Sequence, residues 1–224
     1  MTARTTPPSP HHPLFARLYT KVFAPALDKA GVAEHRRTLL AGLAGEVIEI
    51  GAGNGLNFAH YPPGVKRVLA VEPEPHLRDL AERSARTAPV DVTVTGGIAE
   101  QLPFVDASFD AAVACLTLCS VADPHAVLGE LHRVLRPGGQ LRFFEHVRAD
   151  SPGLRRVQRV VDATFWPLLV GGCHTGRDTL TTITDAGFTV TSVEKFMFPQ
   201  TRLPAPAATH ILGTAERPRP GDTP

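Results

Sequence analysis

Two spacings of apolar residues alternate along the chain. Runs of consecutive apolar residues, bounded by glycine or proline, predict buried parallel strands at 46–50, 65–71, 90–94, 111–116 and 140–147. Apolar residues spaced three or four apart predict helices at 14–27, 32–43, 75–87, 124–135 and 178–186. Two more strands are expected at 188–194 and 209–215. Strands that alternate with helices predict one α/β domain with a largely parallel sheet.

The domain is expected to span 13–216. Residues 1–12 and 217–224 are rich in Pro and polar residues and have no apolar pattern, so both are predicted to be disordered tails. The segment 13–44 is predicted to be helical and to precede the first strand. It either packs on the core or forms a lid, and Tyr19 is its side chain best able to reach a substrate.

Composition limits the expected partners and cellular compartment of the protein. The 23 basic and 22 acidic residues nearly balance, so no strong field favours nucleic acid or an anionic membrane. The longest apolar run, 111–122, is shorter than the roughly 20 residues that cross a bilayer, so no membrane span is expected. Three cysteines without C-x-x-C spacing favour a reducing compartment, here the cytoplasm. A monomer is slightly favoured.

A glycine-rich turn follows the first strand. Gly51, Gly53 and Gly55 let the backbone approach a ligand closely, with amide donors directed at it. Leu56 occupies the place of the last Gly of the dinucleotide fingerprint, which disfavours a nicotinamide oxidoreductase. Glu72 lies 21 positions after Gly51, at a strand end, where an acidic side chain binds ribose hydroxyls.

The pattern E-x-G-x-G-x-G at 49–55 resembles motif I of the class I S-adenosylmethionine (SAM) dependent methyltransferases. Residues 97–104, GIAEQLPF, resemble the G-D-A-E-x-L-P-F segment of the quinone-biosynthesis-like members, and Arg136-Pro-Gly-Gly139 is a common block of the class. The resemblance implies a Rossmann-like, seven-stranded, mostly parallel sheet with an antiparallel last strand. It also implies SAM as cofactor and S-adenosylhomocysteine as product.

The same resemblance gives the cofactor contacts. Ile98 replaces an Asp that accepts from the adenine amine, so Ile98 and the backbone at Ala99 are expected to hold adenine, with Glu100 as a substitute acceptor. The implied set is Glu49, Gly51, Ala52, Gly53, Asn54, Gly55, Asn57, Glu72, Pro73, Ile98, Ala99, Glu100 and Leu116.

Three further segments suggest the methyl acceptor. Leu118-Cys-Ser-Val121, Asn57–Pro63 and Glu145-His-Val147 look like the methyltransferase-like enzymes that methylate small alkyl thiols, with similarity from about His35 to Ala215. S-methylation of a small thiol is therefore the leading hypothesis. A lipid amine, quinone or natural product as acceptor, or a SAM-binding protein without catalysis, remains open.

Sheet topology indicates where the chemistry lies. Ligands bind beyond the carboxyl ends of parallel strands, and the chain brings His146, His174 and His210 to that rim. His146 is the preferred general base or orienter, and the other two compete with it. The remaining acceptor-pocket residues expected are Tyr19, Cys119, Trp166 and Cys173.

The long connection 148–170 is predicted to hold a cap helix. Its buried side is expected to carry Leu154, Val157, Val160 and Val161, and its solvated side Arg155, Arg156 and Arg159. The helix either walls the acceptor pocket or covers the sheet edge. The cysteines and rim histidines also suggest a soft-metal site, but their irregular spacing argues against it, so no metal is expected.

Overall fold

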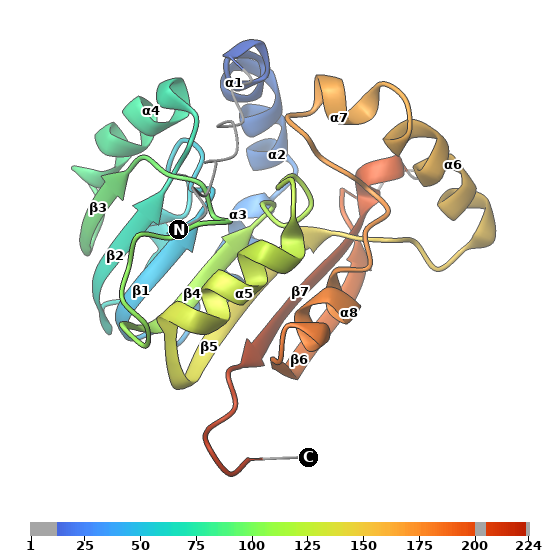
Figure 1. Cartoon of the computed structure of the whole chain (residues 1–224). Coiled ribbons are helices and arrows are strands. Elements are labelled where there is room, and N and C mark those ends of the chain that lie inside the picture. Colours follow the sequence, from blue (N-terminus) through green and yellow to red (C-terminus); the bar gives the residue numbers. More distant parts are fainter. Residues whose placement is uncertain (1–12, 200–204, 223–224) are drawn as a thin grey trace, which may run out of the picture.

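A seven-stranded sheet forms the centre of the computed structural model, which describes residues 13–199 and 205–222. The strand order is β3-β2-β1-β4-β5-β7-β6 (Figure 1). The strands are β1 (Gly45–Ile50), β2 (Val65–Val71), β3 (Asp91–Thr95), β4 (Phe109–Cys115), β5 (Leu135–His146), β6 (Thr189–Met197) and β7 (Thr209–Glu216). The first five pair in parallel, and β7 runs antiparallel to both β5 and β6. The predicted fold class is confirmed.

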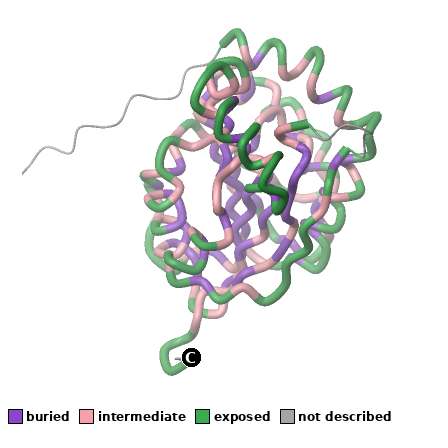
Figure 2. The backbone as a smooth tube through the Cα atoms, turned by 90° about the vertical axis from the view of Figure 1, so that its right-hand side faces the viewer, coloured by how far each residue is buried: buried purple, intermediate pink, exposed green. Residues whose placement is uncertain are grey.

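Helices cover both faces of this sheet. On one face lie α3 (Val32–Leu40) and α4 (Pro75–Ala85), whose Leu39 and Ala81 share a core with Val47 and Val68. On the other lie α5 (Pro124–Val134) and α8 (Thr179–Asp185), which pack on the opposite sides of the same strands. Figure 2 shows the buried residues concentrated in the strands between these helical layers. The sheet is therefore buried on both faces, as continuous apolar strands require.

Three helices begin at capped positions that fix where the adjoining loops end. The side chains of Glu74, Asp123 and Ser151 accept hydrogen bonds from the first turns of α4, α5 and α6 (Pro152–Asp162). A proline follows each cap, where its missing N–H costs no hydrogen bond. The loops that precede α4 and α5 leave from the carboxyl ends of strands, so the caps help to hold the ligand-binding rim.

The N-terminal helix is segmented rather than continuous. The expected helix 14–27 consists of α1 (Pro13–Leu18), a π-helical turn (Tyr19–Phe23) and α2 (Ala24–Lys29). Pro25 has no N–H to donate to the preceding turn, and the Ala24 N–H reaches back to the Tyr19 carbonyl. The segment lies along the rim of the sheet near α7 (Trp166–Leu169) (Figure 1). The widened turn carries Tyr19.

The fourth strand ends earlier than predicted. Leu116 adopts a positive φ of 57°, so the chain leaves the sheet there and 117–121 form a turn. By contrast β5 begins earlier, at Leu135, which pairs with Phe109 before a register shift. A left-handed residue breaks the strand whatever the apolarity of the residues that follow it. The sequence Leu118–Val121 therefore forms part of a loop.

The face that the cap helix α6 buries matches the expected one only in part, with Val161 buried and Leu154 half-buried. Val157 and Val160 are 46% and 59% exposed, whereas Gln158 and Val161 are buried. Gln158 Oε1 accepts from Ala149 N, and its Nε2 donates toward the Val147, Thr175 and Pro206 carbonyls. Loop backbone groups surround the helix here, and an amide side chain satisfies them where valine cannot. The expected exposure of Arg155, Arg156 and Arg159 is observed.

The structure describes most of the predicted C-terminal tail but none of the predicted N-terminal tail. The predicted tail 1–12 lies outside the described residues. In the other predicted tail, Arg217 exchanges backbone hydrogen bonds with Gly138 and Gly139, and its guanidinium donates to the Leu135 carbonyl. Residue 217 therefore extends the contact of β7 with the start of β5. Among the helices described, none combines the length and apolarity needed to cross a bilayer.

Candidate functional site

A cleft opens beyond the carboxyl ends of β1, β2 and β4, with an empty volume, solvent at its mouth included, of about 1140 Å³. Twelve of the thirteen expected cofactor contacts line it: Glu49, Gly51, Ala52, Gly53, Asn54, Asn57, Glu72, Pro73, Ile98, Ala99, Glu100 and Leu116. Gly55 is the exception, because it packs beneath the Phe58 ring, which a Cβ would approach to 2.7 Å. The sequence therefore located the cleft.

Two glycines of the turn have separate physical roles. Gly51 has φ +60°, and a Cβ there would lie 2.5 Å from the Thr117 side chain, so the β4 loop can press against the turn. Gly53 has φ +59° and faces the cleft, with the Tyr19 ring 4.0 Å from its notional Cβ. Its N–H donates to Glu72 Oε2 at 2.7 Å. The turn and the end of β2 are thereby held together.

Glu72 lies almost completely buried at the cleft wall. Its Oε1 accepts from Glu74 N at 2.9 Å, and only 4% of the residue is exposed. Burial raises the pKa of this carboxyl to about 7, although the two backbone N–H donors favour the ionised form. A carboxylate fixed in this way retains lone pairs that can accept from ribose hydroxyls.

The opposite end of the cleft carries a buried polar network. Glu49 accepts from Asn57 Nδ2 at 2.8 Å and from the Tyr61 hydroxyl at 2.6 Å, and burial raises its pKa to about 7. Arg36, from α3, donates to Asn57 Oδ1 at 2.6 Å and to Cys115 Sγ at 3.3 Å. These contacts hold the strand β1 end, the glycine turn and α3 in one unit.

Arg36 provides a test of whether the site fits SAM. Its Nε is buried and has no hydrogen-bond partner in the described part of the chain, yet the residue lines the cleft. A carboxylate is the natural partner of a guanidinium, and SAM has a carboxylate at one end and ribose hydroxyls, which suit Glu72, toward the other. The residues fit the cofactor. Sequence reasoning missed Arg36, since an Arg-Arg pair in a helix ahead of the fold has no distinguishing pattern.

Ile98 and Ala99, the residues expected to hold adenine, line the cleft. Glu100 also lines it, but its Oε1 accepts from Ala122 N at 3.1 Å and, at longer range, from Asp123 N. Part of its acceptor capacity is thus used to tie the loop after β3 to the start of α5. Recognition of adenine by apolar contact with Ile98 is consistent with this arrangement.

Glu145 holds the loop after β4 in place through hydrogen bonds to its backbone. It is fully buried at the end of β5, and its carboxylate accepts from the N–H groups of Thr117, Leu118 and Cys119 at 2.9, 2.9 and 3.1 Å. Burial raises its pKa, while the three amide donors oppose that shift. Glu145 therefore fixes the direction in which Cys119 leaves the loop.

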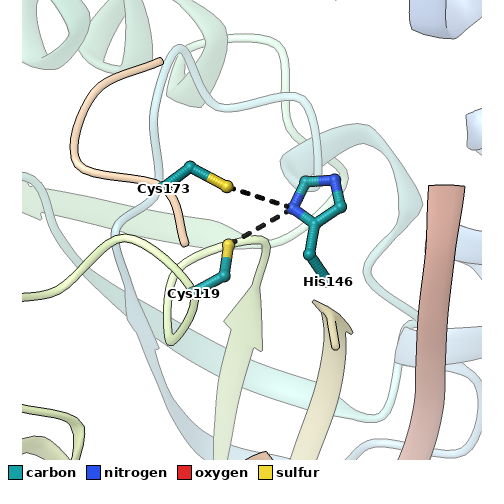
Figure 3. A group of neighbouring side chains, drawn as sticks. All are labelled: Cys119, His146 and Cys173. Atoms are coloured by element: carbon teal, nitrogen blue, oxygen red, sulfur yellow. Dashed lines mark hydrogen bonds between the residues drawn. The ribbon is translucent and has the colours of Figure 1, made fainter. Parts of the chain in front are cut away.

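The next residue, His146, lies between two cysteines (Figure 3). Its Nδ1 is 3.4 Å from Cys119 Sγ and 3.6 Å from Cys173 Sγ. Cys119 and Cys173 are 1% and 2% exposed. The three come from the β4 loop, the end of β5 and the loop before α8, so the fold gathers residues that are far apart in sequence. We call these three residues the Cys-His-Cys cluster.

Protons are unevenly shared within the Cys-His-Cys cluster. Hydrogen bonding from Cys119, and then the proximity of His146, lowers the pKa of Cys173 far below that of an ordinary thiol. The hydrogen bond to Cys173 and burial raise the pKa of Cys119. Burial alone would lower the pKa of His146, but Cys173 reverses this and raises it. The shifts of Cys173 and His146 are both in the direction that favours the charged form of each group.

The other two rim histidines are placed differently. The His210 ring lies 4.5 Å from that of His146, its Nδ1 donates to the Ala208 carbonyl, and burial lowers its pKa to about 3. His210 is therefore a neutral neighbour of the cluster. His174 Nδ1 lies 2.8 Å from the carbonyl of Gly172 and 3.2 Å from the Arg177 guanidinium. Of these two histidines, only His210 contacts His146.

The expected acceptor-pocket residues divide between the cleft and the cluster. Tyr19 and Phe15, both from the N-terminal helical segment, line the cleft, and Phe15 packs on Gly171. Trp166 lies outside the cleft lining, with its indole N–H buried close to Cys173. Ser120 and Gly171 line the cleft, so the cofactor cleft and the Cys-His-Cys cluster share a wall.

Comparison with known proteins finds methyltransferases both among family models and among similar sequences. The family model described as "Methyltransferase domain" matches residues 48–143. The chain is 38% identical over 185 residues to thiol S-methyltransferase TMT1B of Rattus norvegicus, covering 79% of this chain and 73% of that protein.

Solved structures share the fold. A SAM-dependent methyltransferase from Thermotoga maritima, described as a possible histamine N-methyltransferase, is 22% identical with a TM-score of 0.66 over 91% of this chain and 98% of that one. Geranyl diphosphate methyltransferase in complex with SAM is 17% identical with a TM-score of 0.64, over 90% and 89% of the two chains. Proteins with this fold include SAM-bound enzymes, in agreement with the cleft chemistry.

Proposed function

Because this chain belongs to the SAM-dependent methyltransferase family, we propose that it transfers a methyl group to the sulfur of a small thiol. The observation that carries the choice of thiol is the 38% identity, over most of both chains, to a protein named thiol S-methyltransferase. SAM supplies the methyl group on a sulfonium, and an acceptor sulfur takes it by in-line displacement.

The cleft residues bind and orient the cofactor. Glu72 accepts hydrogen bonds at one end, and the unpaired Nε of Arg36 meets a carboxylate at the other. Phe15 and Tyr19 cover the cleft from the N-terminal segment and help to exclude water. Alignment of the reacting groups supplies several kcal/mol of the barrier in such transfers, about 7–11 at best, so positioning is the main contribution of the protein.

The acceptor is expected next to the shared wall formed by Ser120 and Gly171. A free thiol has a pKa near 8.5, so only a few per cent is thiolate at neutral pH. His146 Nδ1 is already engaged by the Sγ atoms of Cys119 and Cys173, 3.4 and 3.6 Å away, so this nitrogen is not free to take a proton from an acceptor. We therefore assign His146 the role of orienter rather than general base. We assign His210 the role of a neutral neighbour and give no direct role to His174, whose Nδ1 lies beside the Gly172 carbonyl and the Arg177 guanidinium.

The test is an assay of the purified protein with SAM and matched panels of small thiols, phenols, amines and quinones. The expected result is formation of S-adenosylhomocysteine and a methyl thioether with thiols, both measured by mass spectrometry. Turnover of an amine or quinone with none of any thiol would show that the acceptor class is wrong. SAM binding by calorimetry without product on any acceptor would indicate a binding protein.

A further inference from the structure

Three side chains with soft or borderline metal-binding atoms converge in the Cys-His-Cys cluster. The two Sγ atoms and His146 Nδ1 all lie within 4.8 Å of one another. Figure 3 shows both sulfurs directed at the same ring nitrogen. The irregular sequence spacing argued against a metal, but these residues meet only through tertiary structure, so spacing along the chain is not informative here.

The separations match those of a tetrahedral zinc site. Zn–S bonds of about 2.3 Å and Zn–N bonds of about 2.0–2.1 Å at tetrahedral angles place N and S about 3.5–3.6 Å apart. The observed Nδ1–Sγ distances are 3.4 and 3.6 Å. We propose that Cys119, His146 and Cys173 bind one Zn²⁺ ion, a site with three protein ligands and an open fourth position.

The fold holds the ligands in place. His174 N donates to the Cys119 carbonyl at 2.7 Å, which ties the two cysteine loops together. Arg177 donates to the Leu118 and Val121 carbonyls at 2.6 and 2.7 Å, so one guanidinium bridges the same two loops. On the other side Glu145 accepts from Cys119 N. Both cysteines are thus fixed from the backbone before any ion binds.

The surroundings suit metal-bound thiolates. The Trp166 indole N–H is buried without a hydrogen-bond partner among the described residues, although it lies close to Cys173. Ser120 Oγ lies 3.6 Å from Cys119 Sγ. Donors beside thiolate sulfur are the outer shell that tunes metal sites. A zinc-bound thiolate gives the buried indole N–H an acceptor of higher charge.

Charge also favours an ion at this place. Two thiolates and Zn²⁺ form a neutral unit with a neutral imidazole, whereas buried thiolates alone are costly to desolvate. A Cys₂His donor set is one that Zn²⁺ uses in catalytic sites that keep an open position.

The open position is suited to the acceptor, and this step rests on the proposed function. A thiol that binds there releases its proton to solvent and stays as a zinc-bound thiolate, which keeps its sulfur nucleophilic at neutral pH. After methylation the sulfur is a neutral thioether, a weaker ligand, so the product leaves.

The first test is metal content. Protein prepared with Zn²⁺ and passed through a weak chelator is expected to retain about one zinc per chain by elemental mass spectrometry. C119S, H146Q and C173S should each retain at least tenfold less, while C115S, a buried cysteine outside the cluster, should retain zinc. A chain that holds no zinc and takes up none with all thiols reduced, or that has a Cys119–Cys173 disulfide as its stable form, overturns the proposal.

Two measurements guard against misfolding of these variants. Co²⁺ added to the metal-free wild-type chain should give the visible absorption of a tetrahedral thiolate site, and no such band at one equivalent would overturn the proposal. Trp166→Phe leaves the ligands intact and should weaken zinc affinity about tenfold, as for other outer-shell changes. Unchanged affinity in that variant would contradict the role given to the indole.

The proposed zinc site and the proposed methyltransferase function can be contradicted independently of each other. Addition of a small thiol should shift the Co²⁺ spectrum even without SAM, because the thiol enters the open position. One zinc per chain without methylation of any thiol supports the site and contradicts the proposed function. Methylation of thiols at full rate by protein free of metal supports the proposed function and contradicts a role for zinc in the reaction.

Discussion

At the scale of single residues, Glu72 shows how burial sets a binding property. The carboxyl is held by the N–H groups of Gly53 and Glu74 and has a pKa of about 7. Ribose hydroxyls donate to the ionised form, so cofactor binding favours loss of the Glu72 proton. The side chain therefore couples SAM affinity to pH near neutrality.

Removing that charge should weaken cofactor binding. Glu72→Gln loses the carboxylate acceptor, and a hydrogen bond to a charged group is worth about 1.5–3 kcal/mol, so the SAM dissociation constant should rise roughly tenfold to a hundredfold. Glu82→Gln, on the exposed side of α4, is the control and should bind SAM like the wild type. Calorimetric titration measures both. Equal affinities in the two variants would show that Glu72 does not contact the cofactor.

The pH dependence has a definite sign. Since the free-state pKa of Glu72 is raised to about 7, the carboxyl is ionised above this pH and SAM binds without a proton change. Below pH 7 a proton must be lost, so affinity should fall by up to about tenfold per pH unit. Titrations between pH 6 and 8.5 in buffers of different ionisation enthalpy measure this release. In Glu72→Gln that component should vanish, and its persistence would assign the proton to Glu49.

At the scale of elements, the loop 171–177 determines how closely the loops that carry Cys119 and Cys173 approach each other. Gly172 has φ +84°, and a Cβ there would lie 2.7 Å from the Ser120 carbonyl oxygen. The two loops that carry Cys119 and Cys173 can therefore approach only because this residue has no side chain. The sequence GGC at 171–173 contained this information, but only the contact with Ser120 reveals it.

Gly172→Ala should separate the two cysteine loops. The left-handed backbone costs about 1–2 kcal/mol for an L-residue, and the clash with a backbone oxygen adds to it. A lower midpoint of urea unfolding and at least tenfold weaker zinc retention are expected. Gly153→Ala, at the start of α6 with nothing within 4 Å of its notional Cβ, is the matched control. Wild-type stability in Gly172→Ala would mean that the loop relaxes freely.

A buried amide, Gln158, is one of the attachments of helix α6, beside Asp162, which accepts from Thr175 N and Gly176 N. Gln158 connects it to the backbone at Val147, Ala149, Thr175 and Pro206. Gln158→Met keeps the size of the side chain but leaves these groups unpaired, at about 1–3 kcal/mol for an unsatisfied buried group. Faster limited proteolysis within α6 and a lower unfolding free energy are expected. Arg156→Gln, exposed on the same helix, should change neither, and similar behaviour of both variants would contradict the anchoring role.

At the scale of the whole molecule, the N-terminal segment borders the cleft, with Phe15 and Tyr19 in its lining. Phe15 packs on Gly171, and Tyr19 lies over Gly53, so the segment touches both the cofactor turn and the cysteine loop. Its fit on the rim depends on the π-helical turn that carries Tyr19. These contacts join the first described residues of the chain to loops that follow strands far along it.

Loosening this cover should weaken cofactor binding. Phe15→Ala removes the ring that rests on Gly171, and a loss of about 1.4 kcal/mol corresponds to a tenfold rise in the SAM dissociation constant. Leu14→Ala is the control, because Leu14 is 83% exposed. Calorimetry with SAM measures both variants. A Phe15→Ala chain that binds SAM as tightly as the control would leave this segment with no role in closure.

The sequence by itself determined the order of strands and helices, the glycine turn with Glu72, and the family. These features can be read along the chain, because they depend on the periodicity of apolar residues, on a short glycine motif and on the fixed distance from that motif to the end of the next strand. The sequence also brought His146, His174 and His210 to one rim, because strand direction alone decides that. Two details differed from the prediction: β4 ends one residue early, before a left-handed Leu116, and α6 buries Gln158 in place of Val157 and Val160, because loop carbonyls near Gln158 leave no periodic trace.

Only the tertiary structure decided how the rim residues meet. It joined Cys119 and Cys173 to His146 and left His174 with its own loop, because the approach depends on Gly172, Arg177 and Glu145. It also brought Arg36 to the cleft from a helix ahead of the first strand. Distances between side chains from separate elements follow from packing across the whole sheet, and no spacing along the chain encodes them.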